Sequence, residues 1–73
     1  MTLNLFTESQ LIAGLGQRLK EQRLRRNLLQ KELADSAGIS VSALKKLENG
    51  GKVTFENFIK VVFALRLERE MMN

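Results

Sequence analysis

The chain has 73 residues and a formal net charge of +4, and it contains no cysteine, histidine or proline. Without cysteine and histidine it has no disulfides, no thiolate or imidazole metal ligands and no histidine general base, so we expect no metal, no cofactor and no enzyme. A chain this short buries about 60% of its unfolded surface and forms one small domain. No apolar run approaches the roughly 20 residues of a membrane span and no signal pattern is present, so we expect a cytoplasmic protein without a membrane partner.

The positive charge is concentrated in the middle of the chain. Residues 18–52 hold nine basic and four acidic residues, a balance of +5, whereas the flanking residues together hold three basic and four acidic ones, a balance of −1. A basic surface of this kind suits phosphate groups, so the charge distribution indicates a nucleic-acid partner.

The first predicted elements are an arm at residues 1–6 and a helix from about residue 7 to about residue 26. Thr7 and Gln10 have the spacing of a capping box. Gly14 and Gly16 weaken the middle of this helix, where a break or kink could occur, and Asn27 is a credible stop. Leucines recur on one face at helical spacing, at Leu11, Leu15 and Leu19.

Two short helices follow, over about 30–37 and 41–48, with a tight turn between them. Gly38 stands where the chain reverses and favours a left-handed backbone, and Ser40 is placed to cap the second helix. Ala34 must be small because the second helix crosses close over it. The other inward positions are apolar: Leu33, Ala37, Ile39, Leu44 and Leu47. This spacing predicts a helix-turn-helix over about 30–49, a motif that presents one helix to a DNA major groove.

A fourth helix is predicted after the turn at residues 49–51. Thr54 can cap it, and its apolar stripe consists of Phe55, Phe58, Ile59, Val62 and Leu65. Residues 68–73 have little to pack against and are expected to fray. The predicted organisation is therefore an arm at 1–6 and a single all-α domain at 7–73.

Four stretches carry a family resemblance: Leu-Gly-Gln-Arg-Leu-Lys-Glu-Gln-Arg (15–23), Gln-Lys-Glu-Leu-Ala (30–34), Ala-Gly-Ile-Ser (37–40) and Leu-Lys-Lys-Leu-Glu-Asn-Gly (44–50). In these motifs and their spacing, residues 11–67 resemble the Cro/phage-repressor (Xre) family of DNA-binding domains. The segment 53–65 is similar to the HipB-like branch, whose members often act as antitoxins. The resemblance implies a compact, four- to five-helix lambda-repressor-like domain that binds a pseudo-palindromic operator as a homodimer.

Two positions depart from the family pattern. Leu29 stands where the family usually has a capping Ser, Thr or Asn, so the helix that begins at Gln30 loses a side-chain cap worth about 1 kcal/mol. Arg66 replaces the glycine that usually ends the fourth helix, so we expect that helix to continue toward Glu70 in place of a short fifth helix.

The outer stripe of the second motif helix is the predicted DNA-reading surface. Val41, at its amino-terminal tip, could meet a thymine methyl group, and the lysines could donate to guanine. Ser42 could read a base edge or hold a phosphate. The sequence leaves open which lysine reads a base, and a solvated helix face is the competing interpretation. The stripe lies opposite the leucines at i, i+3, i+4 and i+7: Ser42, Lys45, Lys46 and Asn49.

A second set of polar residues is predicted to hold phosphates. Gln30 matches the family glutamine that opens the first motif helix, where its side chain and the free backbone N–H groups can bind a phosphate. Similar contacts are predicted around the recognition helix, from Ser40, Asn49, Lys52 and Thr54. For Ser40 and Thr54 helix capping is the main competing role, and the two roles are compatible.

The resemblance further implies a mostly buried, structural ion pair between Arg23 and Glu48. Loss of either partner would leave an unpaired buried charge. The neighbouring basic residues are expected to be partly solvated charges and partly contacts to the DNA backbone: Arg18, Lys20, Arg25, Arg26 and Lys31. Further apolar residues could line a dimer or partner surface, pack in the core or be mobile: Leu3, Leu5, Phe6, Phe63, Met71 and Met72.

Together these patterns predict sequence-specific binding of double-stranded DNA and repression of transcription by a homodimer. The first alternative is an antitoxin that binds a toxin kinase and represses its own operon. The second is a helical adaptor that binds protein and not DNA. The +5 balance over 18–52 and the outer lysines argue against the adaptor.

Overall fold

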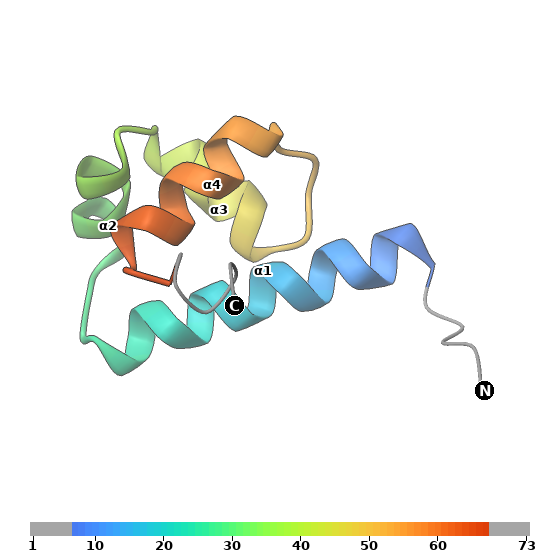
Figure 1. Cartoon of the computed structure of the whole chain (residues 1–73), viewed down its shortest axis with the longest axis horizontal. Coiled ribbons are helices and arrows are strands. Elements are labelled where there is room, and N and C mark those ends of the chain that lie inside the picture. Colours follow the sequence, from blue (N-terminus) through green and yellow to red (C-terminus); the bar gives the residue numbers. More distant parts are fainter. Residues whose placement is uncertain (1–6, 68–73) are drawn as a thin grey trace.

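The computed structural model describes residues 7–67, which form four helices and, within that range, no strand (Figure 1). In chain order the helices are α1 (Glu8–Arg25), α2 (Gln30–Ala37), α3 (Val41–Glu48) and α4 (Phe55–Ala64). The predicted all-α class and the helix-turn-helix are confirmed. The expected arm at 1–6 and the expected frayed end at 68–73 lie outside the described residues.

Helix α1 begins in the predicted capping box and runs without a break. Thr7 Oγ1 accepts from the backbone N–H of Gln10 at 3.1 Å, and the Thr7 N–H donates to Gln10 Oε1 at 2.9 Å. Gly14 and Gly16 do not interrupt the helix. A Cβ at Gly16 would collide with the backbone carbonyl oxygen of Leu47. This glycine therefore lets α1 and α3 touch directly, which an α-helix with a larger residue here would prevent.

The core lies where α2, α3 and α4 meet over the carboxyl half of α1. Helix α2 packs against both α3 and α4, and α3 packs against α1 (Figure 1). Ala34 is fully buried, as its small size predicts. The remaining buried hydrophobic residues are Leu19, Leu33, Leu44, Leu47, Val61, Val62, Leu65 and Leu67. Removal of these side chains from water is the main source of stability for the domain.

All four helices end in the same backbone geometry, a left-handed residue that reverses the chain. In α1, for example, the N–H of Leu28 donates to the carbonyl of Arg23 at 3.1 Å across the reversal. Glycine adopts this conformation without steric cost, whereas a residue with a Cβ costs about 1–2 kcal/mol. The left-handed residues are Asn27 (φ 56°), Gly38 (φ 74°), Gly50 (φ 80°) and Arg66 (φ 63°).

The expectation that α4 continues toward Glu70 is wrong, because α4 ends at Ala64 and Arg66 takes the left-handed conformation. The N–H of Leu67 donates to the carbonyl of Val62 at 3.0 Å, which closes the helix end. This reversal places Leu67 in the core with 8% of its surface exposed. Burial of a leucine contributes about 1.5–3 kcal/mol, which offsets the unfavourable backbone of Arg66.

The expectation that Phe55 faces inward is also wrong. Phe55 opens α4 and is 77% exposed, whereas Val61, outside the predicted stripe, is fully buried. On α1, Leu11 and Leu15 are exposed although they share a face with Leu19. The amino-terminal half of α1 extends past the other three helices (Figure 1), and these helices leave its apolar side chains largely uncovered.

Candidate nucleic-acid interface

Helices α2 and α3 are joined by a three-residue turn whose geometry follows from its sequence. Gly38 is left-handed, and the N–H of Ile39 donates to the carbonyl of Ala34 at 3.0 Å. Ile39 packs against the core and fixes the turn from inside. Ser40 Oγ then accepts from the N–H of Ala43 at 3.0 Å and caps α3. The direction of α3 is thus set by backbone bonds and one apolar contact.

Helix α3 has a buried face and an exposed, cationic face. Leu44, Leu47 and Glu48 are buried against the body of the domain. The residues of the predicted reading stripe are all exposed: Ser42, Lys45, Lys46 and Asn49. Among residues 7–67, no ion pair involves either lysine of this stripe. Their charges are therefore available to a ligand outside the chain.

Val41 lies apart from the exposed stripe. Its side chain is half-buried and packs against the core. Only the remaining part of this side chain can contact a ligand, so Val41 offers less to a DNA base than its place at the start of α3 suggests.

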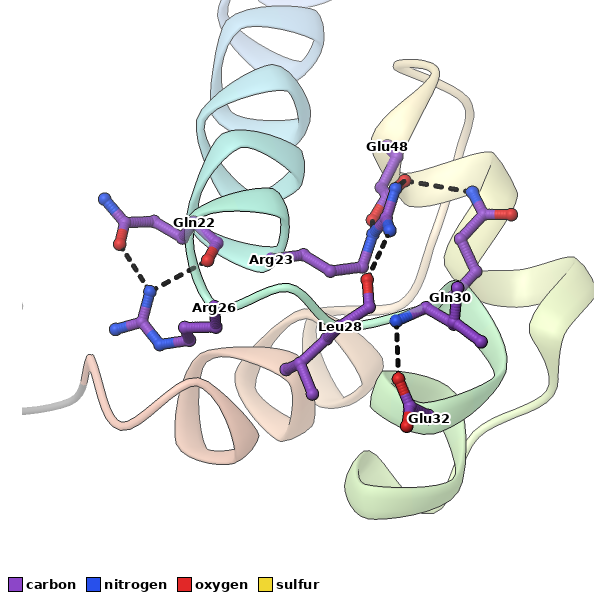
Figure 2. Close-up of polar contacts among 8 residues, drawn as sticks. Gln22, Arg23, Arg26, Leu28, Gln30, Glu32 and Glu48 are labelled. Carbon is purple, nitrogen blue, oxygen red and sulfur yellow. Dashed lines mark hydrogen bonds and ion pairs between the residues drawn. The ribbon is translucent and has the colours of Figure 1, made fainter.

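A buried ion pair anchors the carboxyl end of α3 (Figure 2). Arg23 Nε donates to Glu48 Oε2 at 2.7 Å and Arg23 Nη2 donates to Glu48 Oε1 at 3.2 Å, with the two side chains 8% and 1% exposed. The remaining nitrogen, Nη1, donates to the carbonyl oxygen of Leu28 at 2.7 Å. One arginine therefore ties together α1, the loop that follows it and the end of α3.

Gln30 joins the same network from the start of α2 (Figure 2). Its Nε2 donates to Glu48 Oε1 at 3.0 Å, so one of its two amide N–H groups is engaged and the other is left for a ligand. The neighbouring Leu29 has no side-chain cap, as predicted, and its N–H donates to Glu32 Oε1 at 2.8 Å. Glu32 thus supplies half of a capping box that Leu29 cannot complete.

The structure brings several predicted contact residues together around one polar cleft. The cleft has a volume of about 250 Å³ and lies between the amino ends of α3 and α4. Backbone N–H groups at helix starts favour anions, so two such ends beside lysines make a surface suited to phosphates. Predicted residues that line the cleft are Ser40, Ser42, Lys46, Lys52 and Thr54. Lys45, Asn49 and Gln30 do not line it.

Sequence reasoning missed Asn57, which also lines this cleft. Its backbone N–H donates to Thr54 Oγ1 at 3.0 Å, so it is the third residue of α4. A polar residue three positions after a helix cap was the available signal, because such a residue shares the amino-terminal end of the helix with the cap.

The basic residues around α1 are spread over the surface and are not gathered at the cleft. Arg26 donates to both the carbonyl oxygen and the side-chain oxygen of Gln22, at 2.9 and 2.6 Å (Figure 2). Lys20 is half-buried, and the others of the group are exposed: Arg18, Arg25 and Lys31.

Within residues 7–67, no group of three or more acidic, histidine or cysteine side chains is placed to hold a metal ion. None of the helices in that part of the chain combines the length and the hydrophobicity that crossing a bilayer requires.

A short helix held against a second one by a tight turn, with its outer face exposed and cationic, defines a helix-turn-helix protein of the DNA-binding class. The family model HTH_3, described as helix-turn-helix, matches residues 19–70, and the chain belongs to this family. The chain is also similar to the cryptic phage CTXphi transcriptional repressor RstR of Vibrio cholerae serotype O1 (strain ATCC 39315 / El Tor Inaba N16961). The two are 42% identical over 52 residues, which cover 70% of this chain and 46% of the relative. The chain therefore spans less than half the length of that relative. Neither match bears on the HipB-like branch, so the similarity to that branch stays a prediction.

Proposed function

We propose that this protein is a transcriptional repressor that binds a specific double-stranded DNA sequence. The observation that carries the proposal is the division of α3, whose leucines and Glu48 are buried while Lys45 and Lys46 are exposed and free of ion pairs among the described residues. An exposed helix face of this kind fits a major groove, which admits one α-helix. The similarity to a phage transcriptional repressor supports the same function.

In this proposal Ser42, Lys45 and Lys46 read base edges. A lysine at a guanine donates to O6 and N7, and a serine hydroxyl can pair with either kind of base edge. Val41 adds an apolar contact through the part of its side chain that the core leaves exposed.

Phosphates on either side of the reading helix are held by Ser40, Asn49, Lys52 and Thr54, and by Gln30 at the start of α2. The cleft between the amino ends of α3 and α4 supports this role for Ser40, Lys52 and Thr54, and adds Asn57. Gln30 also donates to Glu48, so its contact to a phosphate would join the DNA backbone to the buried ion pair. Such contacts supply most of the affinity and little of the specificity.

Repression would follow from a homodimer that covers a pseudo-palindromic operator and blocks polymerase. Two copies related by a twofold axis place their α3 helices in successive major grooves about 34 Å apart. The sequence of each half-site would then be read by the same side chains.

The experiment that tests this function is a selection of bound sequences from random duplex DNA at a fixed salt concentration of about 100 mM, because phosphate contacts make the affinity depend on salt. Enrichment of a pseudo-palindrome with half-sites one helical turn apart is the expected result. Salt-sensitive binding without enrichment would contradict sequence-specific recognition. Absence of binding by folded protein would contradict the proposal as a whole and favour a protein-binding adaptor.

A further inference from the structure

One large hollow of the described surface is apolar and lies beside the proposed DNA-binding face. It is a groove of about 460 Å³ between the amino half of α1, the loop at residues 51–54 and the start of α4. Ile12 and Leu15 line one wall, and Phe55 and Phe58 line the other. Leu11, one turn before Leu15 on α1, is 53% exposed. Large apolar side chains gathered on one exposed surface mark an interaction site more often than scattered ones do.

Two opposite charges flank this apolar surface on α1. Glu8 precedes Leu11 by three residues, and Arg18 follows Leu15 by three. At 100° per residue, all four side chains fall within a sector about 80° wide. Glu8 and Arg18 are about 15 Å apart along the helix. Neither of them takes part in an ion pair among residues 7–67.

We propose that this surface binds a second copy of the chain, with the two α1 helices antiparallel. In one register, Glu8 of each copy faces Arg18 of the partner subunit, and Leu11 of each copy faces Leu15 of the partner subunit. The pattern is self-complementary, as a twofold interface requires. A parallel pairing is disfavoured because it would set Glu8 against Glu8 and Arg18 against Arg18.

A small residue, Gly14, lies beside the proposed contact face. Gly14 lies between Leu11 and Leu15, and a Cβ placed there would meet no atom within 4 Å. Unlike Gly16, which contacts α3, Gly14 has no packing role within the described part of the chain. On the helical wheel Gly14 lies about 40° outside the sector of the four side chains, so it leaves one flank of the helix pair unobstructed.

The position of the groove agrees with the proposed function, on which this inference rests. Lys52, Val53 and Thr54 line both the apolar groove and the polar cleft beside α3. A second copy bound at this surface therefore lies at the edge of the proposed DNA-binding face.

The test is sedimentation velocity of the full chain over a range of concentrations, with single and paired charge reversals. Wild-type protein is expected to form dimers. Glu8→Arg and Arg18→Glu should each raise the dimer dissociation constant about tenfold or more, because two facing pairs per dimer become repulsive. The double variant, with both reversals, should recover wild-type association. Leu11→Asp should abolish dimers, whereas Leu24→Asp, on the opposite side of the same helix and similarly exposed, should not.

Three results would overturn the interface: a wild-type chain that stays monomeric, single reversals that leave association unchanged, or a double variant that is not rescued. Thermal melts of each variant establish that the fold is retained, and rescue in the double variant cannot arise from unfolding. Binding to the selected DNA, measured on the same samples, separates the two proposals. A monomer that binds a half-site would overturn the interface alone, and a rescued dimer that binds no DNA would overturn the repressor function alone.

Discussion

The charged residues on the two faces of α3 differ in burial and in pairing within the protein. On the inner face, Glu48 is buried and paired with Arg23, and it accepts a further bond from Gln30. On the outer face, Lys45 and Lys46 are exposed and unpaired within residues 7–67. The inner charge is fully satisfied by the protein, so it can act only on the fold. The outer charge has no partner in the described structure, so it is free to act on a ligand.

This division means that substitutions on the two faces should have different effects, one on stability and the other on DNA affinity. A change on the inner face should lower the free energy of unfolding and lose binding only as a consequence. A change on the outer face should lower DNA affinity and leave thermal stability unchanged.

The largest effect is expected for Arg23→Ala. It leaves the buried Glu48 carboxylate unpaired and removes the bond to the Leu28 carbonyl, which costs about 3–5 kcal/mol of stability. A domain of this size has about 5 kcal/mol in total, so the variant keeps about 0–2 kcal/mol and up to half of it should be unfolded at 25 °C by circular dichroism. Arg25→Ala, two residues later and exposed, is the matched control and should melt like wild type. A well-folded Arg23→Ala protein that no longer binds DNA would place Arg23 in the interface instead.

On the outer face, Lys46→Ala should weaken binding to the selected site by about 1–3 kcal/mol, the range for one base contact. The melting temperature should not change, because the side chain is exposed and unpaired among the described residues. Lys60→Ala, a lysine on α4 that pairs with Glu56, is the control and should bind normally. Equal affinity of the Lys46→Ala variant and wild type would remove Lys46 from the reading surface.

Arg66→Gly belongs to neither face and should stabilise the domain by about 1 kcal/mol, because glycine adopts the left-handed conformation at no steric cost. For a chain of this size that corresponds to a rise in melting temperature of about 4–8 °C. Asn27→Gly, at the same place after α1, should gain less, since asparagine tolerates this conformation better than arginine. A lower melting temperature for Arg66→Gly would show that the arginine side chain makes a contact whose stabilisation exceeds the cost of its left-handed backbone conformation.

The smallest effect is expected for Lys52→Ala, which removes a proposed phosphate contact. Affinity for the selected site and for an unrelated duplex should fall by the same factor. The log–log slope of affinity against salt should become shallower by about 1. A loss confined to the selected sequence would instead make Lys52 a base contact.

Local patterns in the sequence predicted most of the fold. The bounds of α2 and α3 and the left-handed turn at Gly38 were correct, because spacing and a single glycine determine them locally. The predicted end of α4 was wrong. Arginine is unfavourable in the left-handed conformation, and the burial of Leu67 that compensates for it depends on tertiary packing, which the local sequence does not show. For the same reason the sequence predicts wrongly that Phe55 faces inward. Helical spacing shows which side chains share a face, and only the tertiary structure shows whether another element covers that face.

The candidate site was predicted in outline. Spacing within α3 identified the exposed stripe, but periodicity could not show that Val41 turns toward the core. The contact of Gln30 with Glu48 joins residues 18 positions apart, so no local pattern could reveal it. Asn57 was missed because its place in the cleft depends on how α4 meets α3.

The most direct test of the division of α3 is an NMR titration of labelled protein with the selected duplex, read as amide shift changes along the chain. The account predicts the largest changes at residues 40–46, with further changes at residues 49–57, and little change around Leu24 and Phe63. Changes confined to the surface around Leu24 or Phe63, with α3 unaffected, would contradict the claim that the outer face of α3 reads DNA.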